Sequence, residues 1–292
     1  MRDFVISTDT TSDLPEDFIQ ENDIDIHPLT YTFGEEIFGI EQKMSEKDFY
    51  ARMRGGEMPT TMACNPEQSQ EFFEKRVQSG VDVLHIAFSS DLSSTYNNAW
   101  IAGKEVMEQY PDSKIIVIDS LSASMGEGLM VYYAVRLKKQ GKTIDEVAAY
   151  IQEHIQNFCH QFTVDDLNHL YRGGRVSRGT AILGTIAGIK PMLHVSPEGK
   201  LTAVGKVRGR KKSLHTLVET MGKTLGEYQN KNDIVFISHG DCLEDAEYVA
   251  ALVKEQFGVK EIWIHNVCPT IGAHSGPGTV ALFYMGGPRR NL

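Results

Sequence analysis

The stretch VDVLHIAFSSDLSSTYNNAW, residues 81–100, decides the fold class of this chain. Residues 81–88 form an apolar run of strand length, and the pattern from about Ser94 to Tyr110 predicts an amphipathic helix. The hydroxyl-rich loop Ser89 to Thr95 joins them. A strand that passes through a short polar loop into a helix is the repeating unit of α/β proteins.

The same alternation extends along the first half of the chain. Strand patterns occur at residues 4–7, 24–29 and 115–118, and helical patterns at about 45–54, 67–78, 126–140 and 144–157. Strands that alternate with helices of this length predict a largely parallel sheet covered by helices on both faces. The first half is therefore predicted to be an α/β/α lobe.

The pattern changes near residue 160. Short strands are predicted at 162–164, 192–195 and 201–207, with a turn at Pro197 to Lys200. A helix at about 212–229 precedes strands at 234–238 and 261–267, with a further helix between them. We predict a single domain, 1–292, of class α/β. Its N-terminal α/β lobe spans 1–159 and its C-terminal α+β lobe, with a mixed sheet, spans 160–292; the C-terminal tail is free to pack back on the first lobe.

Composition restricts the partners and the compartment. The chain has 29 basic and 39 acidic residues and a formal net charge of −10, which argues against nucleic acid as a partner. No apolar stretch approaches the roughly 18 residues of a membrane span, and the N-terminus lacks signal-peptide anatomy. The four cysteines are widely spaced and fit free thiols in a reducing compartment. We expect a cytoplasmic protein without a membrane span.

Four hydroxyl-rich or glycine-containing segments follow predicted strands of the first lobe. They are residues 8–13, 59–61, 89–95 and 119–126. Ligands of parallel sheets bind beyond the carboxyl ends of the strands, and a helix N-terminus flanked by hydroxyls binds anions. Helix capping explains one such loop, but four loops in one lobe favour a ligand site.

The second lobe contains two further segments of interest. A short helix and a basic loop at 165–178 lead into an apolar stretch rich in small residues at 180–191, which is either a core helix or the wall of an apolar cavity. Residues 271–279 are predicted to form a glycine-rich turn, in which His274 could reach an anion.

No assembled catalytic motif is found. Asp9-Thr10-Thr11 follows a strand, as in a phosphoaspartate phosphatase, but the second acid two residues later is missing. There is no G-x-S-x-G, no Walker A loop and no G-x-G-x-x-G after a strand. We expect no catalytic residue, no metal and no cofactor. The alternatives are a metal-dependent phosphatase or small-molecule kinase that uses Asp9 and the hydroxyl loops, and an interaction scaffold.

Seven segments in order resemble the DegV family of bacterial fatty-acid-binding proteins. They are TDTTSDLP (8–15), SSDLSSTYNNA (89–99), DSLSASMGEGL (119–129), YRGGRVS (171–177), KPMLHVSPEGKL (190–201), VRGRKKSL (207–214) and IGAHSGPGT (271–279). The resemblance implies that the chain binds a long-chain fatty acid in a buried pocket between the lobes, and that it exchanges this lipid transiently at a membrane. It implies that Thr61, the Ser93 hydroxyl and the Ser94 N–H hold the carboxylate, with His274 and Arg172 near the headgroup.

The resemblance also implies a partner protein. Such family members are not enzymes on their own and present the acid to a separate fatty acid kinase, which forms the acyl phosphate. Arg175, Arg208 and Arg210 belong to a basic group in the second lobe that we expect to dock this kinase, against the alternative of ordinary solvated charge. The chain departs from the family pattern at Met62, Ala63, Asp91 and Ser94.

Overall fold

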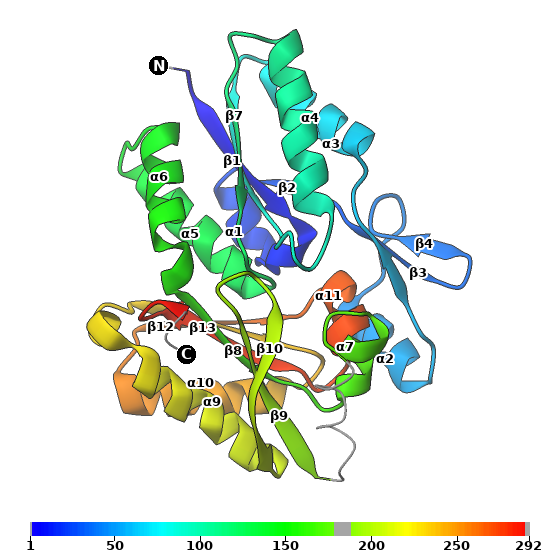
Figure 1. Cartoon of the computed structure of the whole chain (residues 1–292), viewed down its shortest axis with the longest axis vertical. Coiled ribbons are helices and arrows are strands. Elements are labelled where there is room, and N and C mark those ends of the chain that lie inside the picture. The colour runs from blue at the N-terminus through cyan, green and yellow to red at the C-terminus, as the bar shows by residue number, and fades with distance from the viewer. Residues whose placement is uncertain (1, 178–187, 290–292) are drawn as a thin grey trace.

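Four parallel strands form the first sheet, in the order β2, β1, β6, β7 (Figure 1). The structure is a computed structural model that describes residues 2–177 and 188–289. Each strand runs parallel to its neighbours. The strands are β1 (Phe4–Asp9), β2 (Asp25–His27), β6 (Asp82–Ala87) and β7 (Ile115–Asp119). The predicted parallel sheet is confirmed.

Helices cover both faces of the first sheet, because alternate residues of its strands are apolar on each side. Val5, Val83 and Ile115 pack against α3 (Pro66–Val77) and α4 (Thr95–Gln109). On the opposite face of the sheet, Phe4 and Ile6 pack in one cluster with α5 (Met125–Lys139) and α6 (Ile144–His154). The short α1 (Glu16–Glu21) follows β1. We call this sheet and its helices the first lobe.

The second sheet has six strands in the order β10, β9, β8, β13, β11, β12. Only β11 and β12 pair in parallel, so the predicted mixed sheet is confirmed. The strands are β8 (Phe158–Thr163), β9 (Ile189–Val195), β10 (Leu201–Arg208), β11 (Ile234–His239), β12 (Glu261–Asn266) and β13 (Val280–Met285). Helices α9 (Arg210–Thr224) and α10 (Leu243–Phe257) cover its outer face.

Helix α5 lies between the two sheets (Figure 1) and joins them. One buried cluster contains Leu129 and Met130 of α5 together with Ile86 of the first sheet and Phe236 of the second. Gly128 permits this close packing, because a Cβ there would lie 2.5 Å from the Ser12 carbonyl oxygen. The two lobes therefore share a continuous core.

A small antiparallel sheet at the side of the molecule was not predicted. Its strands β3 (Thr30–Phe33), β4 (Glu36–Phe38) and β5 (Thr60–Met62) pair in the order β4, β3, β5. The prediction that 59–61 form a loop is therefore wrong. The three residues of β5 are exposed or half-buried, so their sequence shows no alternation of apolar and polar side chains. The pairing of β5 with β3 depends instead on tertiary structure.

Helices α2, α7 and α11 pack beside this sheet. They span Glu46–Arg54, Leu167–Arg172 and Pro269–Ser275. The predicted turn at 271–279 is thus helical over its first half, and Gly276, with φ of +79°, ends the helix. The apolar stretch at 180–191 is predicted to be either a core helix or a cavity wall. Most of it falls within residues 178–187, which lie outside the described residues.

The described C-terminal residues contact both lobes. The Arg289 side chain is fully buried and donates hydrogen bonds to the carbonyl oxygens of Leu121 at 2.8 Å and Ser196 at 3.2 Å. Leu121 follows β7 in the first lobe, whereas Ser196 follows β9 in the second. Over residues 2–177 and 188–289, no helix has the length and apolarity that crossing a membrane requires.

Candidate ligand-binding cavity

A cavity of about 290 Å³ lies between the lobes. The loops after β6 and β7 form one side, β5 and α11 another, and the inner face of the second sheet its floor. Most of the lining is apolar, which is typical of small-molecule sites. Representative lining residues are Leu29, Phe88, Leu92, Phe162, Ala281 and Phe283.

Thr61 and His274 meet at the cavity wall. The Thr61 Oγ1 atom is 2.8 Å from His274 Nε2, which joins β5 to α11. Burial, together with the nearby Arg175, lowers the pKa of His274 to about 4, so its ring is neutral at pH 7. Gly173 makes room for this ring, because a Cβ there would lie 2.1 Å from His274 Nδ1. The structure thus brings His274 and Thr61 together at the cavity wall.

Ser93 and Ser94 line the same cavity at the start of α4. The Ser93 Oγ atom lies 2.8 Å from Thr95 Oγ1 and accepts a hydrogen bond from the Thr95 N–H at 3.2 Å. Ser94 is the N-cap of α4, but its side chain makes no capping hydrogen bond. Hydroxyl groups and the N-terminus of α4 therefore lie at one wall of the cavity, and groups of this kind are able to bind an anion.

Arg175 and Arg172 lie in different environments. Arg175 lines the cavity, and its guanidinium donates to the Leu92 carbonyl oxygen at 2.8 and 3.1 Å. This links the second-lobe loop to the Ser89–Thr95 loop. Arg172 is exposed, contacts His169 Nδ1 at 2.9 Å, and does not line the cavity. The sequence analysis expected Arg172 near the headgroup and Arg175 at the kinase-docking surface, whereas the structure places Arg175 at the cavity. The sequence of a basic loop does not indicate which arginine side chain turns inward.

The departures from the family pattern have distinct surroundings. The Asp91 carboxylate lies 3.6 Å from the Lys200 ammonium of the second lobe, and Asp91 does not line the cavity. Met62 and Ala63 do line it, beside Thr61. The Asp91 charge is therefore partly balanced by Lys200, and Met62 and Ala63 make the wall near Thr61 more apolar.

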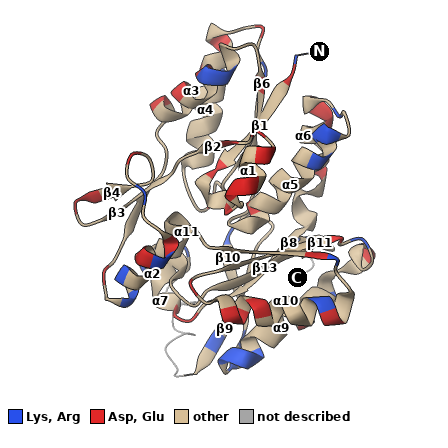
Figure 2. Cartoon of the chain, turned by 180° about the vertical axis from the view of Figure 1, so that it is seen from behind, with Lys and Arg blue, Asp and Glu red and all other residues tan. Residues whose placement is uncertain are grey.

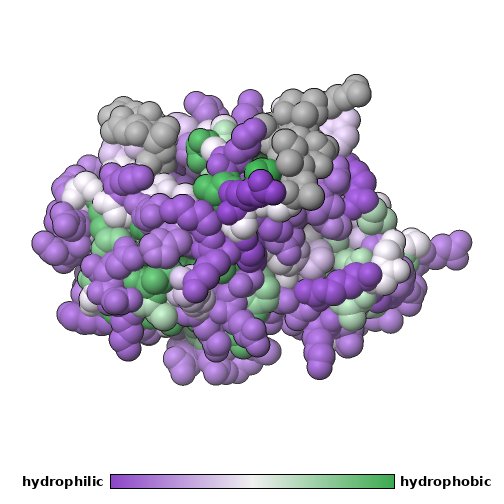
Figure 3. All heavy atoms as spheres, turned by 90° about the horizontal axis from the view of Figure 1, so that it is seen from below, coloured by the Kyte–Doolittle hydropathy of each residue, from purple (hydrophilic) through white to green (hydrophobic). Residues whose placement is uncertain are grey.

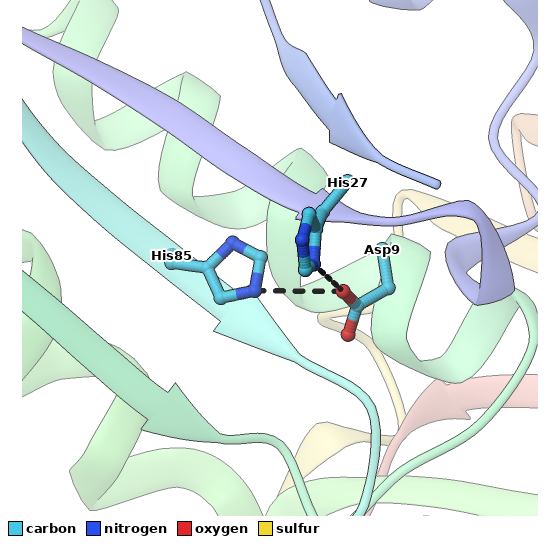
Figure 4. Close-up of side chains that lie close together, drawn as sticks. All are labelled: Asp9, His27 and His85. Atoms are coloured by element: carbon cyan, nitrogen blue, oxygen red, sulfur yellow. Dashed lines mark hydrogen bonds and ion pairs between the residues drawn. The ribbon is translucent and has the colours of Figure 1, made fainter. Parts of the chain in front are cut away.

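Asp9 is enclosed by two histidines on neighbouring strands (Figure 4). Its Oδ1 is 3.3 Å from His27 Nδ1 and 3.5 Å from His85 Nε2, and its Oδ2 accepts the Phe88 N–H at 2.8 Å. Burial opposes ionisation, but hydrogen bonds from His27 and His85 outweigh it and hold the pKa of Asp9 well below its ordinary value. Asp9 is a buried carboxylate that does not line the cavity.

Asp9, His27 and His85 also form a candidate metal-binding cluster in the described part of the chain, because their donor atoms lie within 4.8 Å of one another. The outer imidazole nitrogens contact hydroxyls: His85 Nδ1 is 3.0 Å from Ser7 Oγ, and His27 Nε2 is 3.4 Å from Ser69 Oγ. Hydrogen bonds thus account for this cluster as a structural network, to which we assign no catalytic step.

Asp13 links both lobes beside the cavity. Its carboxylate accepts the Cys268 N–H at 3.0 Å and a short hydrogen bond from the Ser124 hydroxyl. Ser124 Oγ also lies 2.8 Å from Ser238 Oγ of the second lobe. Burial raises the pKa of Asp13 to about 7, although these hydrogen bonds lower it in part.

Asp13→Asn is expected to remove part of the pH dependence of stability. The folded pKa of Asp13 is raised, so its contribution is present below the unfolded pKa of 3.8 and is lost as the pH rises toward 7. Between these values the free energy of unfolding of the wild type should fall by up to about 1.4 kcal/mol per pH unit relative to Asp13→Asn. Urea unfolding at several pH values measures this, and parallel pH profiles would contradict it.

The parallel sheet, the mixed sheet and the apolar cavity between them define a two-lobed α/β protein with a candidate ligand site. A model of the DegV family, described as a family of uncharacterised proteins, matches residues 3–286. A DegV domain-containing protein of Clostridium perfringens is 43% identical over 289 residues, which are 98% of each chain. The chain belongs to the DegV family.

Solved structures of fatty-acid-binding proteins share the fold over nearly the whole chain. A stearic acid-binding protein from Eubacterium ventriosum has a TM-score of 0.88 at 25% identity and matches over 99% of this chain and 100% of its own. A Thermotoga maritima protein whose structure revealed a fatty acid binding function has a TM-score of 0.83 at 28% identity, over 98% and 100%. DegV of Bacillus subtilis, described as a fatty acid binding protein, has a TM-score of 0.85 at 25% identity over 98% of this chain and 100% of its own, so fatty acid binding occurs among DegV family proteins.

Proposed function

We propose that this chain binds one long-chain fatty acid between its lobes and does no chemistry on it alone. The supporting observation is the apolar cavity with Thr61 and Ser93 in its wall. In this proposal the Thr61 and Ser93 hydroxyls and the Ser94 N–H hold the carboxylate. His274 orients Thr61 through their 2.8 Å contact.

The acyl tail supplies most of the binding free energy in this proposal. Burying about 14 methylenes at roughly 0.8 kcal/mol each gives on the order of 11 kcal/mol before ordering costs. Two hydrogen bonds to the carboxylate add only about 3–6 kcal/mol. The hydroxyls therefore orient the ligand rather than retain it.

The test is denaturing extraction of the purified protein followed by mass spectrometry. We expect a stoichiometric long-chain fatty acid and no turnover of phosphorylated substrates with divalent metal. Repeated absence of acyl species, together with failure to bind added fatty acid, would refute the proposal. Metal-dependent turnover would instead support the enzyme alternative.

Thr61→Ala and Ser93→Ala should each weaken fatty acid binding while leaving the fold intact. A lost hydrogen bond to a charged group costs about 1.5–3 kcal/mol, and the double variant should be less than additive because both hydroxyls hold one carboxylate. Titration with a fluorescent fatty acid measures the dissociation constants. Thr60→Ala is the control, since Thr60 is exposed and does not line the cavity. An unchanged dissociation constant in the double variant would refute the assignment.

We further propose that a separate fatty acid kinase docks on basic residues of the second lobe. Figure 2 shows Lys and Arg on β9 and α9, and Figure 3 shows the face seen from below as largely hydrophilic. Arg210 is paired with Asp245 at 2.8 Å, and Arg175 is bound to Leu92. Arg208 is exposed, and no described residue forms an ion pair with it. Arg172 and Arg208 are therefore the more available for docking.

Charge reversal at Arg172 or Arg208 should slow acyl-phosphate formation by the kinase through slower association, while fatty acid content stays unchanged. Rim charges act mainly on association rates and their salt dependence. The measurement is kinase turnover against salt concentration with lipid-loaded proteins. Lys75→Glu, an exposed position on α3 of the first lobe, is the matched control. Superimposed curves for all proteins would eliminate the docking proposal.

A further inference from the structure

A histidine lies in the apolar floor of the cavity. Residues of β8 alternate between the two faces of the second sheet, so Phe158 and Phe162 pack toward the first lobe while Cys159 packs toward α9 and α10. By this alternation His160 points to the same side as Phe162, and both line the cavity. Thr61, Ser93 and His274 of the proposed carboxylate site come from β5, the loop before α4 and α11, so His160 is contributed by a different element of the cavity wall.

The position of the His160 ring is fixed by its neighbours. The edge-to-face contact with Phe283 has ring centroids 5.5 Å apart, at an interplanar angle of 87°. On the other side the ring lies against the first turn of α5, where a Cβ on Gly126 would be 2.2 Å from His160 Nε2. Glycine at 126 thus makes room for an imidazole.

His160 is fully buried, with 1% of its surface exposed, and neither ring nitrogen has a hydrogen-bond partner among the described residues. Burial, and to a smaller extent Arg289 and His194, lower its pKa well below the ordinary value, so the ring is neutral. A neutral imidazole offers one N–H donor and one acceptor nitrogen. A buried polar group without a partner is costly, and an unbranched alkyl chain cannot satisfy it.

We propose that His160 hydrogen-bonds a hydroxyl group on the acyl chain, and that the preferred ligand is a monohydroxylated long-chain fatty acid. This inference rests on the proposed function, whose carboxylate site it leaves unchanged. A hydroxyl both donates and accepts, and so matches a neutral imidazole, whereas a carboxylate only accepts. The surrounding Phe162, Ala281 and Phe283 offer no competing polar side chain.

The test compares octadecanoic acid with a series of monohydroxyoctadecanoic acids in which the hydroxyl moves along the chain. Competition binding to the delipidated protein should show one hydroxyl position that binds about tenfold more tightly than octadecanoic acid, or about 1.4 kcal/mol. His160→Phe should abolish that preference and bind octadecanoic acid at least as tightly as the wild type does.

His194→Phe is the matched control and should keep the preference. His194 is a buried histidine on the neighbouring strand β9, and it does not line the cavity. If octadecanoic acid binds as tightly as every hydroxy isomer, or if His160→Phe keeps the preference, the inference is overturned while fatty acid binding stands. If neither kind of acid binds, the proposed function fails as well. A water molecule on His160 in a crystal structure with the preferred hydroxy acid bound would also overturn it.

Discussion

Ala281→Trp is expected to reduce fatty acid binding far more than either hydroxyl substitution. Ala281 lies on the central strand β13 and lines the cavity, so an indole at this position would occupy space proposed for the acyl tail. Displacing about six methylenes would cost roughly 5 kcal/mol, or several thousandfold in the dissociation constant. Titration with a fluorescent fatty acid, supported by acyl content after purification, measures the loss.

Val204→Trp is the matched control for this change. Val204 lies on β10, is half exposed and does not line the cavity, so the same side chain there should leave fatty acid binding intact. Circular dichroism and thermal unfolding would show whether Ala281→Trp retains the fold. Wild-type affinity in a folded Ala281→Trp protein would show that the tail lies elsewhere.

Asp9→Ala is expected to lower the free energy of unfolding by about 3–5 kcal/mol, because it leaves several buried groups without a partner. The Phe88 N–H and the His27 ring lose their hydrogen-bond acceptor, at 2.8 and 3.3 Å, and the His85 ring loses the carboxylate 3.5 Å from its Nε2. Urea unfolding of the lipid-free protein measures the change, so that ligand binding does not mask it.

Asp9→Asn separates the structural role from a catalytic one. The amide keeps an oxygen that can accept the Phe88 N–H, so its loss of stability should be smaller than that of Asp9→Ala. A phosphatase or kinase that uses Asp9 would lose turnover in the folded Asp9→Asn protein. Equal stability of Asp9→Ala and the wild type would contradict the network described for this carboxylate.

The elements predicted best were those whose own sequence carries a strong period. The strand at 81–88 and the helix at 94–110 correspond to β6 and α4, since an apolar run and an amphipathic face need no distant partner to be recognised. The strand β5 could not be found in this way, because its three residues depend on pairing with β3. By contrast, β13 is an apolar run of six residues that fits a strand pattern but is absent from the predicted strands.

The residues of the candidate site also differ in whether the sequence could identify them. Thr61, Ser93, Ser94 and His274 were named from a family resemblance, and the structure places them all at one cavity. His160 carried no signal in the sequence, because a lone histidine within an apolar strand is usually structural. The meeting of Asp9 with His27 and His85 depends on the order of strands in the sheet, which local patterns do not determine.

The central place of β13 affects how the nascent chain acquires its cavity. This strand pairs with β8, more than a hundred residues earlier, and also with β11, so the second sheet stays divided until the ribosome has made residues 280–285. Such long-range contacts slow folding, because a large loop must close first. The cavity floor at Ala281 and Phe283 is therefore synthesised after the other strands of the second sheet, and a ligand can be enclosed only after these residues have left the ribosome.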